Sequence, residues 1–469
     1  MRQKFNAQSE FNFQPSNLKL TNQYYAKYEF ISKILDENPN LVSEAHRDLE
    51  KPLKYAKTKG LDGREHRITT EQVLRTLLCQ VIEGASLREI VIRLDDSNFL
   101  RQFVRIYNGP MMDYTTLDKL KNSILPETWK KINRLLGTYA VEKKLISGEK
   151  VRIDTTAVET NIHYPTDSSL LWDTFRVLAR LITQAREIDS RAAGSQRFHV
   201  KRAKRLQQQI ARKAGKAQST SELKSRYKAL IEMVEAISTS ALDVRRMLEE
   251  GSKHNRYTLF NDLLVQGLID QIEHYVNLGR RVVDQARRRV LLGESVPNDE
   301  KLFSIFEPHT ELLKRGKAGK EVEFGHMIQI QQVRQKFITD YDAFEKKPIE
   351  HQLLTPALKH HRELFGCDPK ILAADKGYYE SVEALAALRE NVDVVAIGKK
   401  GNRTREETEL EHEPAFRHAQ RFRAGVEGTI SFLKRVLGLL RCFNKGWQHF
   451  ASTVGATVFS HNLLALARA

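Results

Sequence analysis

Three carboxylates in this sequence stand where acids could converge and do chemistry. Asp154 lies in a β-branched run at residues 151–158, Asp375 closes the apolar run at 370–375, and Glu427 lies in a long amphipathic segment. Two strands and a helix would bring the three together. Carboxylate oxygens are the hard ligands that Mg²⁺ takes in enzymes acting on phosphodiesters. We therefore interpret Asp154, Asp375 and Glu427 as candidate catalytic residues and metal ligands.

Each strand acid also has an ordinary explanation or a competitor. A lone acid within a β-branched strand is costly to bury without a partner, which favours a role for Asp154. Asp375 precedes Lys-Gly-Tyr, so a simple turn residue explains it equally well. Ligand sites in open α/β sheets nevertheless gather where strands end. Glu159 has the opposite strand parity to Asp154 and is expected to face away, and Asp167 lies beyond Pro165.

The segment around Glu427 predicts a helix with two different faces. At about 100° per residue, one stripe carries polar and charged residues. Its members are Gln420, Arg423, Glu427 and Lys434. A second, apolar stripe predicts docking on a sheet through Phe422, Val426, Leu433 and Leu437. The functional interpretation has Glu427 binding metal while Arg423 and Lys434 contact DNA phosphate. The alternative is an Arg–Glu pair at i,i+4, worth about 0.3 kcal/mol, beside a solvated Lys.

The charge balance favours a polyanionic partner. The chain has 76 Lys and Arg against 59 Asp and Glu, a net charge of +17. The densest basic run covers residues 197–216, and a second block covers 280–289. Solvated helix faces would look the same, but the recurrence beside a candidate phosphodiester site favours phosphate contacts. The predicted DNA-binding residues in these blocks are Lys201, Arg202, Lys204, Arg205, Arg287 and Arg288.

Length and hydropathy bound the class of protein. A chain of 469 residues is too long for one hydrophobic core and predicts two to four domains. No stretch approaches the roughly 18 apolar residues of a membrane span, and the N-terminal residues lack the apolar segment of a secretory signal. We therefore expect a cytoplasmic protein with no membrane partner.

The order of expected elements predicts an α/β fold. Residues 1 to about 50 carry no strong period and are expected to form a partly ordered arm. Helices follow, with start signals at Thr69 and Ser86; short helices with tight turns fit a helix-turn-helix DNA reader, as they do any small helical bundle. A strand at 151–158 precedes a helical stretch to about 295. The expected order then continues with a hairpin of 302–306 with 322–330 and a helix at 350–364. It ends with strands at 370–374 and 392–397 around a helix at 380–389, and with the Glu427 helix.

Three motifs give the chain a family resemblance. The sequence resembles the DDE transposases of bacterial insertion sequences in three places. These are Asp154-Thr155-Thr156, the segment from Ala374 to Tyr378, and the spacing of Arg423, Glu427 and Lys434. That family typically has Tyr before the Arg, whereas this chain has Gln420 at that position, which is one departure from the family pattern. The resemblance runs from about residue 65 to the C-terminus. An insertion after the first strand is a second departure.

The resemblance implies a fold and a domain plan. The fold is a ribonuclease H-like mixed sheet flanked by helices, with an all-α N-terminal domain and an α-helical insertion after the first strand. The plan is a helical DNA-binding region at 1–148, a catalytic domain at 149–164 plus 300–469, and a basic helical insertion at 165–299.

The resemblance also implies an activity. The protein would bind the terminal inverted repeats of its element as double-stranded DNA, cleave there, and join the 3′ ends to target DNA, as a homodimer or larger assembly at the bacterial nucleoid. Two unit charges about 4 Å apart repel by roughly 4 kcal/mol at an effective dielectric of 20, so three acids call for cations. Two Mg²⁺ ions are expected, with Mn²⁺ as a substitute. A structure-selective nuclease of the same fold and an inactive, domesticated DNA-binding protein are the alternatives.

Overall fold

The chain divides into two compact units that are described separately. The structure is a computed structural model that describes residues 17–58, 68–194, 197–213, 220–317 and 320–468. One unit is Met1–Asn161 together with Gly325–Ala469, and the other is Ile162–Phe324. The second unit contains the stretch 165–299 that the sequence marks as a basic helical insertion. The two candidate strand acids and the Glu427 helix all lie in the first unit.

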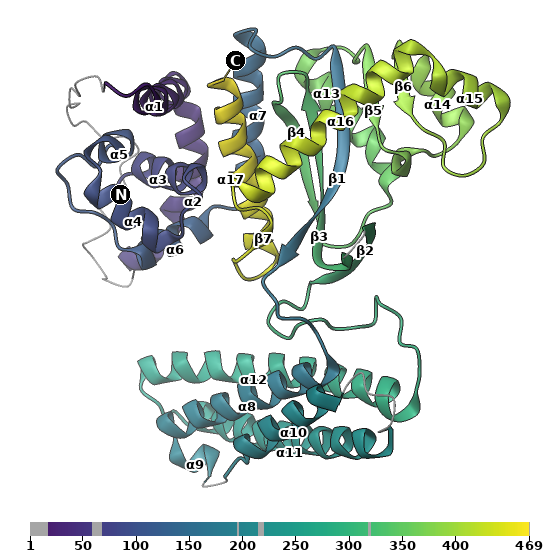
Figure 1. Cartoon of the computed structure of the whole chain (residues 1–469). Helices are drawn as coiled ribbons and strands as arrows, with labels where there is room; N and C mark the ends of the chain where they lie inside the picture. The colour runs from purple at the N-terminus through teal and green to yellow at the C-terminus, as the bar shows by residue number, and fades with distance from the viewer. Residues whose placement is uncertain (1–16, 59–67, 195–196, 214–219, 318–319, 469) are drawn as a thin grey trace. The chain divides into compact units, whose positions relative to one another are not determined.

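A mixed sheet is the frame of the first unit, and only its residues 311–317 and 320–324 fall on the other side of the division between Phe324 and Gly325 (Figure 1). Among the described residues it has seven strands: β1 (Lys150–Thr160), β2 (Glu311–Lys317), β3 (Lys320–Val333), β4 (Ile338–Phe344), β5 (Ile371–Ala374), β6 (Val394–Ile397) and β7 (Arg441–Cys442). β1 is central, antiparallel to β3 and parallel to β5. β4 pairs antiparallel with β3, β6 parallel with β5, β7 parallel with the end of β1, and β2 also pairs with β3. The predicted mixed α/β fold is confirmed.

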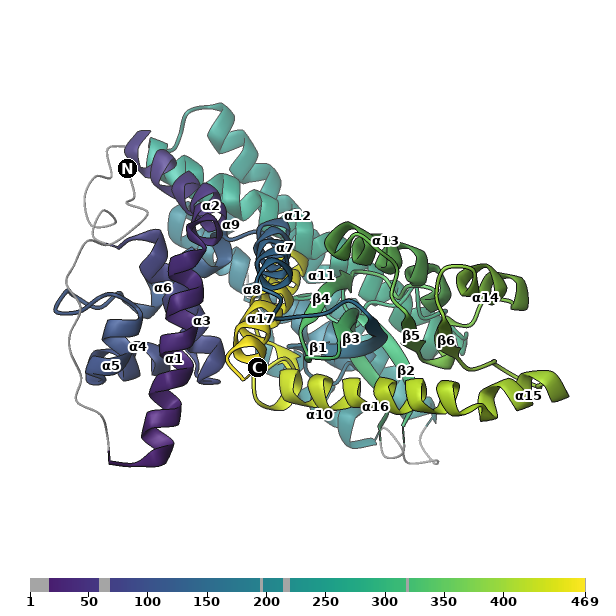
Figure 2. The same ribbon diagram turned by 90° about the horizontal axis from the view of Figure 1, so that it is seen from above.

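Helices cover both faces of the parallel half of the sheet. In Figure 2, α16 (Pro414–Arg435) lies on one side of the strands and α13 (Leu354–Phe365) on the other. Alternation along β1 separates these faces: Val151 and Ile153 pack with Leu358 of α13, whereas Arg152 contacts α16. Val426 and Leu433 on α16 are buried, as the predicted apolar stripe requires. The α13 side also includes α14 (Val382–Arg389), and η3 (Glu350–Leu353) precedes α13.

Helices also form the N-terminal part of this unit. They are α1 (Lys19–Glu37), α2 (Pro39–Thr58), α3 (Thr70–Ile82), α4 (Leu87–Asp96), α5 (Asn98–Phe103), α6 (Tyr114–Ser123) and α7 (Pro126–Glu142). The capping signals are confirmed, since Thr69 forms a capping box with Gln72 and Ser86 forms one with Glu89. The predicted arm at 1–50 is wrong over its described part, because Tyr28, Ile31 and other residues bury one face of α1. Residues 1–16 lie outside the described part.

Two further segments differ from the sequence prediction. The predicted strand at 302–306 is wrong: Leu302 and Ile305 pack into the helical core of the second unit without joining a sheet. The strand that precedes β3 in the chain and pairs with it is β2, and β3 also pairs antiparallel with β4; the sequence prediction missed both β2 and β4. Also missed were α15 (Arg405–His412) and α17 (Trp447–Leu466); α17 packs against α7 and β4. An apolar run alone does not distinguish a strand from a core segment, and burial by the helices decides here.

The second unit is built on a helical bundle. Its helices are α8 (Asp167–Ile188), α9 (Ser190–Ala193), α10 (Val200–Lys213), α11 (Thr220–Lys253), α12 (Leu259–Ala286) and the π-helical turn η2 (Arg287–Leu292). α8, α10, α11 and α12 lie side by side (Figure 1). Leu178, Ile231 and Ile272 are among the buried residues of its core. Residues 214–219, and with them Lys216 of the predicted basic run, lie outside the described part.

A buried arginine fastens α16 to the sheet. Arg152 Nε and Nη2 donate to Gln332 Oε1 on β3 at 2.9 and 2.5 Å, and Nη1 donates to the Phe422 carbonyl oxygen at 2.7 Å. The guanidinium also lies over the Phe422 ring, 4.8 Å from its centroid. A Cβ on Gly425 would collide with Arg152 Nη1, so a glycine stands where the helix crosses the arginine. Burial lowers the pKa of Arg152 to about 10.

We predict that Arg152→Ala destabilises the first unit by about 3 kcal/mol, because it removes three hydrogen bonds that join Gln332 to the Phe422 carbonyl and leaves a cavity at a buried position. Urea unfolding measures the change. Arg421→Ala, at an exposed position on the same helix, is the control and should shift the free energy of unfolding by less than about 0.5 kcal/mol. Equal effects of the two substitutions would show that Arg152 does not fasten α16.

Candidate active site

The register of two parallel strands sets the distance between the strand acids. Ile153 of β1 pairs with Ala374 of β5. Asp154 and Asp375 are the next residues along the two strands, at the point where β5 ends and β1 continues to Thr160. In an open α/β sheet the carboxyl ends of parallel strands form the edge at which ligands bind. Both candidate strand acids therefore lie at this edge.

Asp154 is a largely covered carboxylate with a basic neighbour. Its side chain is 14% exposed, and Oδ1 accepts from the backbone N–H of Thr155 at 2.8 Å. Arg423 Nη1 of α16 lies 3.6 Å from Asp154 Oδ2. Asp375, in contrast, is exposed and caps the short turn η4 (Lys376–Tyr378), with Oδ1 accepting from Lys376 N at 2.7 Å. Each carboxylate is thus oriented by a hydrogen bond from the backbone N–H of the next residue.

Gln420, the departure from the family pattern, holds Arg423 in place. Gln420 Nε2 donates to the carbonyl oxygens of Ala396, at 2.7 Å, and Ala374, at 3.4 Å. These are residues at or next to the ends of β5 and β6. Gln420 Oε1 in turn accepts from Arg423 Nε at 3.2 Å. The amide therefore links the sheet edge to the guanidinium that faces Asp154.

Glu427 is oriented differently from the two strand acids. Its side chain is 70% exposed, and Oε1 lies 3.9 Å from Arg423 Nη2. The structure therefore contains the i,i+4 pair that the sequence offered as an alternative, and the same Arg423 also faces Asp154. Lys434, two turns further along α16, is partly buried. Among the residues that the structure describes, no group of three His, Cys, Asp or Glu side chains is arranged to hold one metal ion.

A fourth acid, Glu350, belongs to the same edge and was missed by sequence reasoning. It opens η3, and its Oε1 accepts from the Thr155 hydroxyl at 2.6 Å. Its Oε2 lies against the backbone of Gly377, two residues after Asp375. In the sequence Glu350 has the appearance of an ordinary acid in a helix first turn, so no signal there distinguishes it. Only the packing of η3 on η4 reveals it.

Tyr378 lies in the negative potential of the carboxylates at this edge. Its ring is fully buried, and its hydroxyl accepts from Gln329 Nε2 at 3.1 Å. Burial, together with the negative charges of Asp154, Glu350 and Asp375, raises the pKa of Tyr378 well above its usual range. Three carboxylates from three elements therefore act on one phenol.

The donor set at this edge fits a hard divalent cation in type and in charge. Asp154, Asp375 and Glu427 offer only carboxylate oxygens, which suit Mg²⁺ and Mn²⁺, and Glu350 adds a further negative charge beside them. Within the described ranges, neither Asp375 nor Glu350 forms an ion pair with a basic side chain. Acids that gather without cationic partners repel one another, and a bound cation relieves that repulsion.

The competing residues have other partners. Glu159 is buried and accepts from Arg441 Nε and Nη2 at 3.1 and 2.6 Å. Asp167 accepts from Gln285 in the second unit, at 2.8 Å. His326 is a core residue, packed against the rings of Trp447 and Phe450. Each of these contacts is structural.

The predicted DNA-binding residues of the second unit fall into two groups. Lys201, Arg202, Lys204 and Arg205 are exposed on α10, a helix with no acidic residue. Arg287 and Arg288 instead have close acidic partners: Arg287 Nη2 is 2.7 Å from Glu235 Oε1, and Arg288 contacts Glu294 and Glu300 at 2.9 and 2.7 Å. The first group presents charge to solvent, whereas the second is largely neutralised.

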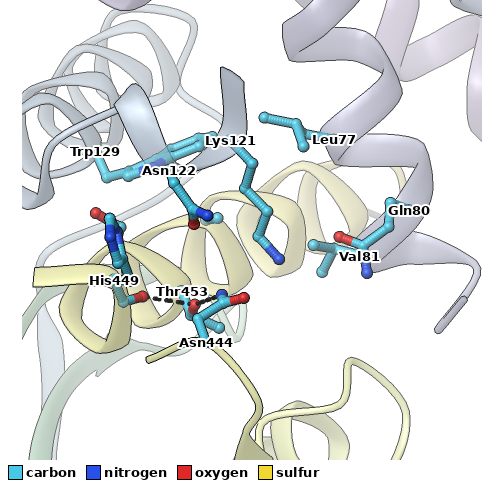
Figure 3. A pocket seen from close by; sticks show the side chains of 11 residues that line it. Leu77, Gln80, Val81, Lys121, Asn122, Trp129, Asn444, His449 and Thr453 are labelled. Carbon is cyan, nitrogen blue, oxygen red and sulfur yellow. Dashed lines mark hydrogen bonds between the residues drawn. The ribbon is translucent and has the colours of Figure 1, made fainter. Parts of the chain in front are cut away.

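A separate pocket lies among α3, α6, α7 and α17 of the first unit (Figure 3). In Figure 3 the amine of Lys121 points into it, close to Asn444 and Thr453. Burial lowers the pKa of Lys121. The lining has amides, hydroxyls, an imidazole and apolar groups but no carboxylate. This pocket is therefore unsuited to a divalent cation and is distinct from the sheet edge.

Carboxylates at the strand ends of a mixed α/β domain are typical of enzymes that bind hard cations. Residues 299–463 match the family model of the transposase DDE domain. The match confirms the predicted resemblance to DDE-type transposases. It spans Asp375 and Glu427 but begins after Asp154, which the helical unit separates from them in sequence.

Two other comparisons add no relative. No curated protein matches the chain, and neither does any solved structure. None of the described helices is both long and apolar enough to cross a membrane.

We predict that Asp375→Asn stabilises the protein in EDTA at pH 7 by about 0.5 kcal/mol, because it removes one of several like charges while Asn keeps the cap on η4. Added MgCl₂ should reduce this gain, since a cation bound to the native state stabilises the unchanged protein more. Urea unfolding with and without MgCl₂ measures both effects. Glu380→Gln, at an exposed acid beyond the turn, is the control. A destabilised Asp375→Asn protein would contradict the proposed repulsion.

Proposed function

We propose that the protein is a transposase that binds the terminal inverted repeats of its insertion sequence, cleaves at the ends and joins the 3′ ends to target DNA. One observation carries the proposal: the β1–β5 register brings Asp154 beside Asp375 in a chain that matches a transposase DDE domain. The strand arrangement supports a ribonuclease H-like fold, because three antiparallel strands, β4, β3 and β1, are followed by the parallel pair β5 and β6.

Asp154, Asp375 and Glu427 are the proposed catalytic residues and would hold the divalent cations. Two Mg²⁺ ions, or Mn²⁺ in their place, would supply activation of the attacking hydroxyl and stabilisation of the leaving oxygen. The exposed Glu427 side chain is free of tight packing, so a change of rotamer toward the sheet edge costs little. Gln420 keeps the Arg423 guanidinium beside Asp154, where it can contact a DNA phosphate.

DNA contact is proposed for three parts of the chain. Arg423 and Lys434 on α16 would contact phosphates near the cleaved bond, and the exposed basic residues of α10 would contact phosphates farther away. The helical N-terminal region would recognise the repeat sequence. Because two ends must be held together for joining, we propose a homodimer or a larger assembly.

The direct test is a cleavage and joining assay with a DNA fragment that carries the element end. In MgCl₂, the unchanged protein should nick the end and join it to a target, whereas Asp375→Ala should lose both products by at least about 10³-fold, because a metal ligand is removed. Products are resolved on denaturing gels.

The outcomes of this assay separate the alternatives. Equal product from both proteins would overturn the catalytic assignment. Cleavage that proceeds without joining would favour a structure-selective nuclease of the same fold. Binding of the end without either reaction, by a folded protein, would favour a domesticated DNA-binding protein.

For α10, we predict that replacing Lys201, Arg202, Lys204 and Arg205 together by Gln weakens DNA binding and flattens its salt dependence. The slope of log K against log salt should fall by about 0.9 for each DNA phosphate that the helix no longer neutralises. Fluorescence anisotropy over a salt series measures it.

The double variant Arg287→Gln, Arg288→Gln is the matched comparison for α10. We expect a smaller change in slope there, because both guanidiniums already have acidic partners. An unchanged slope for the α10 variant would show that this helix does not contact DNA.

A further inference from the structure

Glu350 connects the two segments that carry the strand acids. Its Oε1 accepts from the hydroxyl of Thr155, the residue after Asp154, at 2.6 Å. Its Oε2 lies against Gly377, the second residue after Asp375. One carboxylate therefore contacts both β1 and the turn that follows β5, on the face of the sheet opposite α16.

Gly377 leaves the space that the Glu350 carboxylate occupies. A Cβ at position 377 would coincide with Glu350 Oε2. Gly377 has no positive φ, so the backbone alone does not require glycine. The close approach of the carboxylate gives a physical reason for the absent side chain.

Glu350 also adds charge where charge is already unfavourable. It forms no ion pair with a basic side chain in the described ranges, and the group that donates a hydrogen bond to it is the neutral hydroxyl of Thr155. Asp154 and Asp375 lie close enough that all three act on the Tyr378 phenol. Asp154 has Arg423 as a basic neighbour, whereas Asp375 and Glu350 form no ion pair in the described ranges. The repulsion among these carboxylates raises the energy of the site, and a bound divalent cation reverses that cost.

We propose that Glu350 is a positioning residue of the cation site, which ties the Asp154 strand to the Asp375 turn and raises the affinity of the site for a divalent cation. This inference rests on the proposed function, because it assumes that Asp154 and Asp375 hold the cation. Glu350 acts through Thr155 and Gly377, and through its charge, and no contact with DNA is assigned to it.

The experiment measures Mn²⁺ binding to the full chain without DNA, by the electron paramagnetic resonance signal of free Mn²⁺. Glu350→Gln keeps the size and an oxygen acceptor but removes the charge, and it should weaken Mn²⁺ binding roughly 10-fold. Gly377→Ala should also weaken binding, because the methyl group displaces the carboxylate. Thr155→Val should weaken it, whereas Thr155→Ser keeps the hydroxyl and should restore it. Glu363→Gln, at an exposed acid on α13, is the control.

A second measurement distinguishes a positioning role of Glu350 from a general loss of folding or activity. The Mn²⁺ concentration for half-maximal DNA cleavage should rise in Glu350→Gln by the same factor as the dissociation constant, while the rate at saturating Mn²⁺ stays within about 3-fold of the unchanged protein. A merely structural role would lower the saturating rate or the stability and leave the Mn²⁺ dependence unchanged.

Different results would overturn the inference on Glu350 and the proposed cation site of Asp154 and Asp375. If the protein binds Mn²⁺ and Asp154→Asn abolishes binding, but Glu350→Gln matches the unchanged protein, the inference on Glu350 is overturned and the proposed function stands. If Asp154→Asn and Glu350→Gln both bind as the unchanged protein does, or if no Mn²⁺ binds and no DNA is cleaved, the proposed cation site is overturned as well.

Discussion

The parallel pairing of β1 with β5 is the constraint on which the rest of the site depends. Backbone hydrogen bonds fix Ile153 opposite Ala374, so Asp154 and Asp375 follow as neighbouring residues at the end of β5. Side chains alternate along a strand, and a slip of one residue would turn Asp154 toward the α13 core and Ile153 toward α16. The apolar face formed by Val151 and Ile153 opposes that slip. Core packing on one face thus sets the position of the acid on the other.

The helix α16 completes the edge from one side and the η3–η4 contact completes it from the other. Arg152 holds α16 against the sheet through Gln332 and the Phe422 carbonyl. Gln420 then fixes Arg423 beside Asp154. On the opposite face Glu350 joins Thr155 to the turn after Asp375. Asp154, Asp375 and Glu350 are therefore held by hydrogen bonds with neighbouring residues, whereas the exposed Glu427 side chain has only a 3.9 Å ion pair with Arg423.

Local patterns in the sequence predicted the elements that carry the acids. The alternation of apolar and polar residue types predicted β1, an apolar run predicted β5, and the helical stripe predicted the face of α16 that carries Val426 and Leu433. Capping boxes at Thr69 and Ser86 marked helix starts correctly, because they depend only on residues three apart. The strand proposed at 302–306 was wrong, since its apolar residues serve a helical core instead.

What the sequence did not predict depends on tertiary contact. Glu350 lies 195 residues from Thr155 in the chain, so their hydrogen bond leaves no local pattern. The role of Gln420 depends on the carbonyl ends of β5 and β6, and Arg287 and Arg288 were separated from the exposed charges of α10 only by their acidic partners. The composition of a segment and the spacing of its apolar residues predict which face of a helix or strand is buried. They do not predict which other element packs against that face.

The proposed function requires that this sheet edge binds a divalent cation. The most direct measurement is anomalous X-ray diffraction from crystals of the full chain soaked in MnCl₂, which locates manganese without reference to activity. We predict an anomalous peak within about 2.0–2.6 Å of carboxylate oxygens of Asp154 and Asp375. Manganese bound elsewhere, with no peak between these two residues at saturating MnCl₂, would contradict it.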